Sequence, residues 1–359
     1  MDNEIFNKNK ITIKDIARVA KVSPATVSLV INDKPGISKN TRYRVLRIIR
    51  NLNYTPNLVA RSLVKRQSKS IAMLITNTRN PVFPEIAEGV DNALKKYGYS
   101  LIIITTYDED KLEAKEIKMV KARGIDGIIT SAARLDSENI VALAESGFPT
   151  ICVLRRIYNC NELDHVVADN FKGGYLAAEH LIRMGHRRIG IIKGQLNAST
   201  FIERFNGASK AFKVYGVPIL QDLIQQGDNS KESGYLATNK LMKLRPNRIP
   251  TAIFACNDEM AIGALESLFD TGVKIPNDVA LVGFNNAQTT ALRTIEISTI
   301  NQRNYEMGYL AAKRLIDKIE KKKGYKNPFH IILDPELLIR KSCGYSISSK
   351  YKINKIKWE

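Results

Sequence analysis

Polar side chains follow four apolar runs of this sequence, at positions suited to binding a small molecule. Asn80 comes after "SIAMLIT", Ser131 after "GIIT", Asn257 after "AIFAC" and Asn285 after "ALVGF". If these runs are strands of open α/β sheets, the side chains lie beyond the carboxyl ends of the strands, where such folds bind ligands. Amides and hydroxyls bind polar groups through hydrogen bonds, so the pattern predicts a site for a polar ligand.

Signatures of catalysis and of metal binding are missing from the sequence. It has no Walker loop, nucleophile elbow or metal-ligand spacing, and the candidate pocket residues include no paired acid and base. We therefore expect a binding protein that is not an enzyme and that uses no cofactor. Four cysteines without C-x-x-C spacing predict neither a zinc site nor a disulfide framework, which fits a reducing cytoplasm: Cys152, Cys160, Cys256 and Cys343.

The segment from Thr12 to Leu52 has the pattern of three short helices. Its apolar residues recur at helical spacing in three stripes, which are interrupted at 21–23 and at 32–38. Thr12, Ser23 and Ser38 are suited to cap the helices, and Pro24 suits a first helical position. Two short helices joined by a three-residue turn predict a helix-turn-helix, which places its second helix in the major groove of DNA.

Positive charge is concentrated at the N-terminal end of the chain. The formal net charge is +19, of which residues 1–70 carry +11 and the remaining 289 residues carry +8. A basic module favours a polyanionic partner, because neutralising phosphates releases condensed counterions. The alternative is a solvated basic arm with no partner.

From Ser70 onward, β-branched runs alternate with long amphipathic segments. Helix-glycine-strand junctions recur five times, which indicates a doubly wound α/β core. The segment "MDNEIFNKNK" lacks the apolar centre of a signal peptide, and no apolar run is long enough to span a membrane. We therefore expect a cytoplasmic protein. The glycines are Gly98, Gly147, Gly185, Gly216 and Gly272.

The sequence resembles the lactose/galactose-repressor family of bacterial transcription regulators. The likeness begins with "ITIKDIARVAKVSPATVSLVIN" and continues through "NPVF", "VVADNFKGGYLAAEHLIRMGHRRIGII", "CNDEMAIGAL" and "IPNDVALVGF". It extends to about Tyr345, and the order of the motifs makes it specific.

This resemblance implies a sequence-specific repressor that binds operator DNA on the nucleoid and responds to a small sugar-type effector. It also implies a homodimer or a tetramer, of which the homodimer is favoured because no long heptad tail follows Tyr345. The fold expected is a small all-α headpiece before an α/β core of two doubly wound lobes, similar to periplasmic sugar-binding proteins. The expected ranges are a headpiece at 1–56, a hinge helix and linker at 57–69, a core at 70–345 and a basic mobile tail at 346–359. Within the core, lobe one takes about 70–168 plus 299–327, and lobe two takes about 169–298 plus 328–345.

By the same resemblance, residues 23–32 form the recognition helix. Its apolar surface, Pro24, Ala25 and Leu29, is expected to face the bases, where Ala25 and Leu29 can meet thymine methyl groups. Leu29 stands where the family often has arginine, so we expect a different operator preference with more weight on DNA shape. The expected phosphate contacts are Thr12, Ser23, Thr26, Ser28 and Asn32.

The resemblance also implies a hinge helix in the minor groove over Asn57 to Leu63. Leu63 takes the position of a leucine wedge between base pairs, which bends the DNA and allows more contact. Ala60 is small enough for close approach, and Arg61 can reach phosphates. The alternative is that the apolar residues of this segment pack on the headpiece.

For the effector site, the resemblance adds four residues to those at the strand ends. Phe83 is expected to be an apolar platform, and the other three are Arg204, Asn229 and Gln302. Asn285 stands where the family usually has aspartate, and Asn229 replaces a usual aromatic wall. With Arg155 and Arg156 at another strand end, we expect a cationic pocket and an effector such as a sugar acid or sugar phosphate. Asp169 is a further candidate, for which helix capping is the competing role.

Two other functions remain open at the level of sequence. One is a catabolite-control regulator that uses a phosphoprotein co-repressor instead of a small molecule. The other is a sugar-binding receptor, which the core alone would support but the predicted helix-turn-helix does not.

Overall fold

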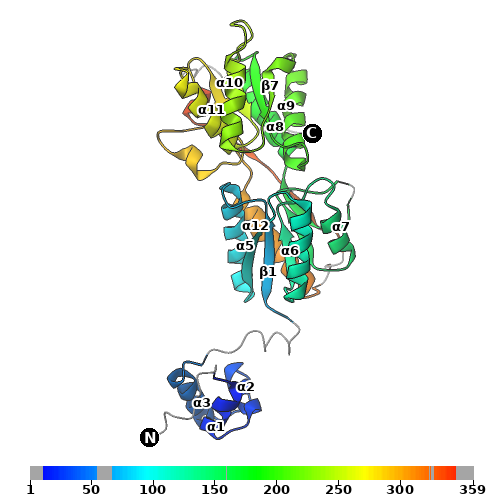
Figure 1. Ribbon diagram of the computed structural model, residues 1–359, viewed down its shortest axis with the longest axis vertical. Helices are drawn as coiled ribbons and strands as arrows, with labels where there is room; N and C mark the ends of the chain where they lie inside the picture. Colours follow the sequence, from blue (N-terminus) through cyan, green and yellow to red (C-terminus); the bar gives the residue numbers. More distant parts are fainter. Residues whose placement is uncertain (1–10, 55–66, 159, 323, 325–326, 345–359) are drawn as a thin grey trace. The chain divides into compact units, whose positions relative to one another are not determined.

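The computed structural model describes residues 11–54, 67–158, 160–322, 324 and 327–344 (Figure 1). These residues form two compact units, one before Lys69 and one from Lys69 onward. In the described part of the chain, no helix is long and apolar enough to cross a membrane.

The first unit is a three-helix headpiece, as predicted. Its helices are α1 (Ile13–Ala20), α2 (Pro24–Ile31) and α3 (Lys39–Asn51). Each begins at a side-chain cap: the hydroxyls of Thr12, Ser23 and Ser38 accept hydrogen bonds from backbone N–H groups of the first turn. The three helices enclose a small core formed by Ile16, Ala17, Ala20, Val27, Val30 and Val45.

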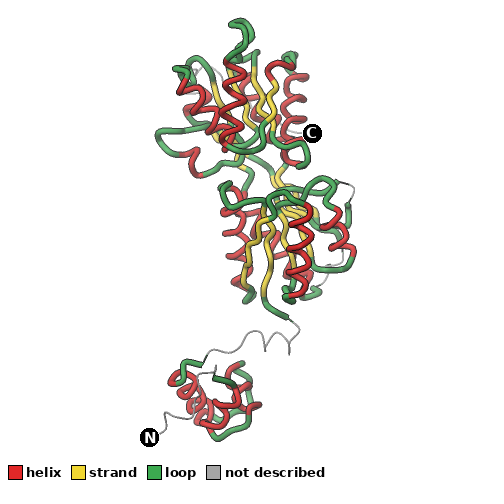
Figure 2. The backbone as a smooth tube through the Cα atoms, in the orientation of Figure 1, coloured by secondary structure: helices red, strands yellow, loops and turns green. Residues whose placement is uncertain are grey.

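A six-stranded parallel sheet forms the centre of the first lobe (Figure 2). Met73 and Ile129 face α5 and α12, whereas Leu74 and Ile128 face α6 and α7, because successive residues of a strand point to opposite faces. In spatial order the strands are β11 (His330–Leu333), β5 (His165–Ala168), β4 (Thr150–Val153), β3 (Gly127–Thr130), β1 (Ser70–Ile75) and β2 (Ser100–Thr105). The helices are α5 (Val82–Lys96), α6 (Asp110–Ala122), α7 (Glu138–Glu145) and α12 (Asn304–Ile319).

The second lobe repeats this arrangement around a four-stranded parallel sheet. Its helices pack in pairs, α8 with α9 and α10 with α11. In spatial order the strands are β7 (Ile224–Gln226), β6 (Ile189–Lys193), β8 (Ala252–Ala255) and β9 (Ala280–Val282). The helices are α8 (Asn170–Arg183), α9 (Ser199–Val214), α10 (Lys231–Met242) and α11 (Asp258–Asp270), with 3₁₀ turns η1 (Gln221–Leu223), η2 (Gln288–Ala291) and η3 (Lys341–Cys343).

Three chain crossings connect the lobes. The first follows β5, the second is β10 (Thr299–Asn301), and the third includes β12 (Glu336–Leu338), which pairs antiparallel with β10. The expectation that residues 328–345 belong to lobe two is wrong for β11, which pairs with β5 in the sheet of lobe one, whereas η3 packs on β9 in lobe two as expected. A four-residue apolar strand carries no signal for which sheet it joins, and β5 offers it an open edge.

The five glycines predicted to end helices all do so in a left-handed conformation. Their φ angles lie between 65° and 97°. A side chain strains this conformation, so glycine ends the helix there at the least cost and lets the next strand begin. The doubly wound architecture predicted from these junctions is confirmed.

Candidate functional site

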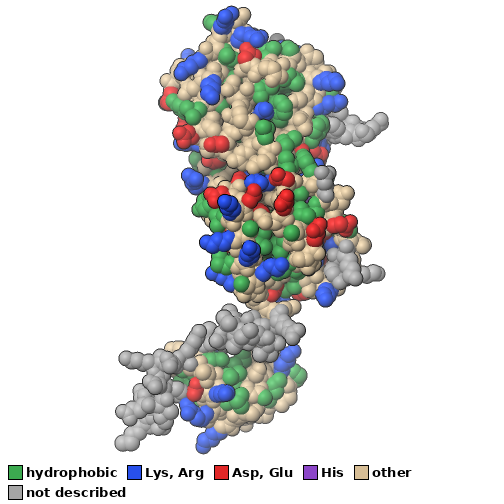
Figure 3. Space-filling model, turned by 45° about the vertical axis from the view of Figure 1, so that its right-hand side comes forward, with side chains coloured by type: hydrophobic (Ala, Val, Ile, Leu, Met, Phe, Trp, Pro, Cys, Tyr) green, Lys and Arg blue, Asp and Glu red, His purple; other side chains and the backbone are tan. Residues whose placement is uncertain are grey.

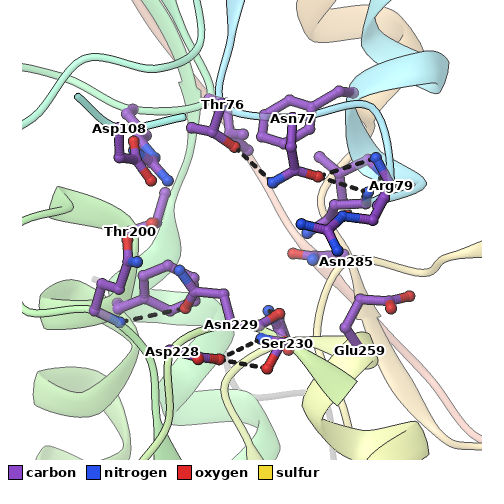
Figure 4. A pocket seen from close by; sticks show the side chains of 18 of the residues that line it. Thr76, Asn77, Arg79, Asp108, Thr200, Asp228, Asn229, Ser230, Glu259 and Asn285 are labelled. Atoms are coloured by element: carbon purple, nitrogen blue, oxygen red, sulfur yellow. Dashed lines mark hydrogen bonds and ion pairs between the residues drawn. The ribbon is translucent and has the colours of Figure 1, made fainter. Parts of the chain in front are cut away.

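A cavity of about 520 Å³ lies between the two lobes (Figure 4). Its walls come from segments that follow β1, β2 and β4 in lobe one and β6, β7, β8 and β9 in lobe two. The cavity therefore lies beyond the carboxyl ends of both parallel sheets. Its size is within the range of about 300–1,000 Å³ that is typical of small-molecule sites.

Apart from Arg156, ten side chains are predicted for a ligand site, and seven of them line this cavity. Of the other three, Ser131 donates to the carbonyl of Leu74, and Asp169 caps α8 by accepting from the backbone N–H of Lys172. Gln302 lies behind the wall, in contact with Arg204. The seven are Asn80, Phe83, Arg155, Arg204, Asn229, Asn257 and Asn285.

Arg204 is a buried cation in the wall of the cavity, with 2% of its surface exposed. Its guanidinium packs 3.7 Å from the centre of the Phe284 ring. It donates to Asn170 Oδ1 at 2.9 Å, to the carbonyl of Cys256 at 2.7 Å and to Gln302 Oε1 at 2.8 Å. Burial lowers its pKa to about 9. These hydrogen bonds use three of its five N–H groups, and the other two have no acceptor among the described residues.

The pocket is not cationic, contrary to the expectation from Arg155 and Arg156. Arg155 forms a buried ion pair with Asp108 at 2.8 Å, so its charge is neutralised within the wall. Arg156 lies outside the lining and pairs with Glu203 at 2.8 Å. Acidic and basic side chains are interspersed where the lobes meet (Figure 3). Four of each sign line the cavity: Arg79, Arg155, Arg204 and Lys231, and Asp108, Asp228, Glu232 and Glu259.

Amide side chains provide the remaining hydrogen-bonding groups. Asn257 caps α11 through its oxygen and donates to the carbonyl of Asn229, and Asn229 Oδ1 accepts from the backbone N–H of Gln195. The oxygens of the Gln195 and Asn285 side chains are buried without a hydrogen-bond partner among the described residues. A buried acceptor without a donor is costly, so a ligand that donates hydrogen bonds fits here.

Sequence reasoning missed several lining residues. Asn77 and Asp108 follow β1 and β2, so the strand-end rule could have found them. The same rule applies to five more residues that lie one or two positions after a strand: Thr76, Tyr107, Leu154, Gln195 and Asp228. The remaining missed residues precede or begin helices, and no strand-end pattern marks them. The missed residues are Thr76, Asn77, Arg79, Val82, Tyr107, Asp108, Leu154, Gln195, Thr200, Phe201, Asp228, Ser230, Lys231, Glu232 and Glu259.

In the headpiece, α2 presents an apolar surface to solvent. Pro24, Ala25 and Leu29 are exposed, with Leu29 at 38%, whereas Val27 and Val30 are buried against the other helices. A helix with these exposed groups can contact thymine methyl groups, but it has no side chain for bidentate contact with guanine.

Two polar side chains near α2 have structural partners. The Asn32 amide donates to the carbonyl of Ser28 at 2.8 Å, on its own helix. Arg42 pairs with Asp33 and donates to the carbonyl of Lys34, so it braces the turn between α2 and α3. Ser23 and Thr26 hydroxyls lie 3.0 Å apart at the start of α2. The predicted hinge residues Asn57, Ala60, Arg61 and Leu63 lie outside the described residues.

Two family models match this chain. The model of bacterial regulatory proteins of the lacI family matches residues 12–57. The model of periplasmic binding proteins and the sugar binding domain of the LacI family matches residues 68–334. The chain belongs to the LacI family of bacterial regulatory proteins. The match over the headpiece favours a DNA-binding regulator over a sugar-binding receptor.

Relatives of this LacI-family chain are repressors. The repressor PurR of Haemophilus influenzae (strain PittEE) is 35% identical over 333 residues, which are 92% of this chain and 98% of the relative. The regulator CelR in complex with cellobiose is 28% identical, with a TM-score of 0.70 over 93% of this chain and 100% of CelR. The lac repressor dimer bound to operator and the anti-inducer ONPF shares the fold, with a TM-score of 0.83 and 23% identity over 93% of this chain and 99% of that one. This chain is thus a DNA-binding transcription regulator with an effector-binding core, not an enzyme.

Proposed function

We propose that this LacI-family chain is a homodimeric repressor whose operator affinity is controlled by a neutral sugar. The main support is that polar side chains of both lobes line one cavity, so a ligand there contacts both lobes at once. A ligand that binds one lobe geometry more tightly shifts the protein toward that geometry. Because the operator is chromosomal, the protein acts in the cytoplasm, on the nucleoid.

A neutral sugar suits the cavity better than a sugar acid or sugar phosphate. The charges of the lining residues balance, and Asp108 neutralises Arg155. Phe83 and Phe201 supply apolar surface for a sugar ring, while Asn285 and Gln195 offer acceptors for hydroxyl groups. The two N–H groups of Arg204 without acceptors can bind a ring or hydroxyl oxygen. CelR, a structural neighbour, is complexed with cellobiose.

Calorimetry with matched ligand pairs tests this choice. Neutral sugars are compared with the corresponding acids and phosphates, for example glucose with gluconate and glucose 6-phosphate. We expect a neutral sugar of the panel to bind at least tenfold more tightly than its charged partners, and Arg204→Gln to abolish that binding. Tighter binding of an acid or phosphate would contradict the neutral class.

On DNA, the proposal assigns base contact to Ala25 and Leu29, which are exposed on α2. Thr12, Ser23 and Thr26 lie at or near the starts of α1 and α2, and Ser28 lies in the middle of α2. All four are assigned to the phosphates. Selection of bound DNA from a random pool tests this assignment. A palindromic site with thymines under the recognition helix is expected, and selection without any sequence preference would contradict it.

For the homodimer, the proposal assigns a surface of lobe two to the second copy of the chain. Leu265, Val273, Ile275 and Ile295 form the apolar part of a hollow of about 760 Å³, which charged residues also line, together with Phe269, which is 82% exposed. An exposed aromatic beside apolar side chains is typical of an interface core.

Sedimentation of charged variants tests this surface. Phe269→Glu is expected to weaken dimerisation at least tenfold, since it would bury a carboxylate in the interface. Leu236→Glu is the control, because Leu236 is 53% exposed on α10 and lies outside the hollow. A Phe269→Glu protein that remains as dimeric as the wild type would contradict the assignment.

A further inference from the structure

A continuous row of polar side chains connects Arg204 in lobe two with Glu85 in lobe one. Arg204 Nη2 donates to Gln302 Oε1, Gln302 Nε2 donates to Asn304 Oδ1, and Asn304 Nδ2 donates to Glu85 Oε2, each at 2.8 Å. Arg204, Gln302 and Asn304 are each at most 2% exposed. The row starts on α9, passes the end of β10 and reaches α5 through the first residue of α12.

All three hydrogen bonds point the same way, from the cation to the carboxylate. A guanidinium has no acceptor, so Gln302 must present its oxygen to Arg204 and its NH₂ to Asn304. Asn304 in turn must present its NH₂ to the acceptor-only carboxylate of Glu85. The two amide dipoles are therefore aligned between the charges, and aligned hydrogen bonds polarise one another.

The row connects Arg204 to a third carboxylate, in addition to those of Asp258 and Glu203, which favour its charged form without contacting it. Its other acceptors, Asn170 Oδ1 and the carbonyl of Cys256, are uncharged. A buried cation without a compensating charge is unfavourable. Glu85 is itself partly buried, and this burial raises its pKa. Each end of the row therefore carries a charge that is costly to bury and that the other end can offset.

We propose that Glu85 and Asn304 are positioning residues of the effector site, which hold the Arg204 guanidinium in place through Gln302. Neither residue lines the cavity, so their effect on a ligand is indirect. Asn304 Nδ2 also donates to the carbonyl of Asn285 at 3.1 Å, which ties a second part of the wall to lobe one. A ligand that binds Arg204 or displaces Asn285 therefore also affects the hydrogen bonds that reach Glu85 on α5. The ligand part of this inference rests on the proposed function, whereas the row itself does not.

A double-mutant cycle on the full chain, followed by urea unfolding, tests the row without any ligand. Glu85→Gln keeps an acceptor for Asn304 but removes the charge. We expect it to lower the folding equilibrium constant at least tenfold in the wild-type background. With Arg204→Met as background, where no cation needs a counter-charge, we expect a loss of less than threefold. Equal losses in both backgrounds would overturn the proposal.

The matched control is Glu88→Gln, one turn further along α5, where the side chain is exposed. This variant should change stability less than threefold in either background. A loss as large as that of Glu85→Gln would assign the effect to the charge of α5 in general and would overturn the role of Glu85.

A second measurement reads Arg204 directly and does not require Arg204→Met to fold. The Arg204 Nη2–H signal, from the group that donates to Gln302, is identified in NMR spectra by its absence in Arg204→Lys. Its hydrogen exchange should become at least tenfold faster in Asn304→Ala and Glu85→Gln and stay unchanged in Glu88→Gln. Unchanged exchange in Asn304→Ala would overturn the proposal. If no sugar of the panel binds, the proposed effector class fails while these stability and exchange results still stand.

Discussion

The surroundings of Leu29 and of Asp258 allow the effect of a single substitution to be predicted. Leu29 is exposed on α2, where a residue facing DNA decides which base edges can be read. Asp258 is buried at the start of α11, where it accepts from the Thr299 hydroxyl at 2.7 Å and from the backbone N–H of Ala287 at 2.7 Å. Each effect can be tested by one substitution.

Replacing Leu29 by arginine should change the selected operator. A guanidinium can bond both acceptors of a guanine edge, a contact worth about 1–3 kcal/mol of discrimination. Selection from a random pool should therefore show guanine enriched at one position of each half-site. Leu46→Arg adds the same charge on α3 and should leave the sequence unchanged. If Leu29→Arg selects the wild-type site, residue 29 does not face the bases.

Replacing Asp258 by asparagine should remove a pH dependence of stability. Burial raises the pKa of Asp258 to about 7, from 3.8 for a free side chain, although its hydrogen bonds oppose this. The folded state then binds the proton more tightly, so stability falls as pH rises from about 4 to 7. At about 1.4 kcal/mol per unit, the loss reaches up to about 4 kcal/mol. Urea unfolding between these pH values should show the slope in wild type and in the exposed control Asp270→Asn. The same slope in Asp258→Asn would contradict this role.

At the scale of elements, tightly packed helix pairs hold the site residues. Glycine allows α8 and α9 to approach closely: a Cβ at Gly174 would lie 2.0 Å from the carbonyl oxygen of Arg204. The backbone that carries Arg204 is thus fixed by a residue that cannot have a side chain. At the starts of α11 and α10, the capping residues Asn257 and Ser230 form part of the cavity wall.

Gly174→Ala should therefore damage the site as well as the fold. The added methyl must push α9 away from α8, which costs about 1–3 kcal/mol and displaces Arg204. Calorimetry should show at least tenfold weaker sugar binding. Leu181→Ala is the control, because Leu181 is fully buried on the same helix, away from the cavity, and its loss lowers stability only. Equal sugar affinity in both variants would show that helix spacing does not position Arg204.

At the scale of the whole molecule, one group of contacts between the lobes involves α9 and the residues just before it. Glu203 on α9 accepts from Arg156 and from the Tyr158 hydroxyl of lobe one, and the Ser199 hydroxyl accepts from the backbone N–H of Arg156. A backbone hydrogen bond from Leu135 to Asn197 adds to this connection. These contacts hold the two lobes in the observed geometry.

Removing Glu203 should loosen this connection. Glu203→Ala loses both side-chain partners in lobe one, so small-angle scattering should show a larger radius of gyration than for wild type. Asp222→Ala is a matched control, because Asp222 pairs with Arg248 within lobe two. An unchanged radius in Glu203→Ala would show that the remaining connections between the lobes, such as the row from Arg204 to Glu85, maintain the lobe geometry without Glu203.

Local sequence patterns predicted what depends on local structure. Helix caps, glycine stops and strand-end asparagines are encoded within a few residues, and these predictions agree with the structure. Strand order is not encoded locally, so the pairing of β11 with β5 and of Arg155 with Asp108 could not be derived. The contact of Asn304 with Glu85 joins residues 219 positions apart, and no sequence pattern indicates it.

The central claim is that a small molecule in the cavity controls the binding of operator DNA. Its most direct test is fluorescence anisotropy with the selected operator, at fixed salt, with and without the neutral sugar that binds most tightly. The account predicts a change of at least tenfold in the operator dissociation constant for wild type and none for Arg204→Gln. An operator affinity that stays the same at saturating sugar in the wild type would contradict the account.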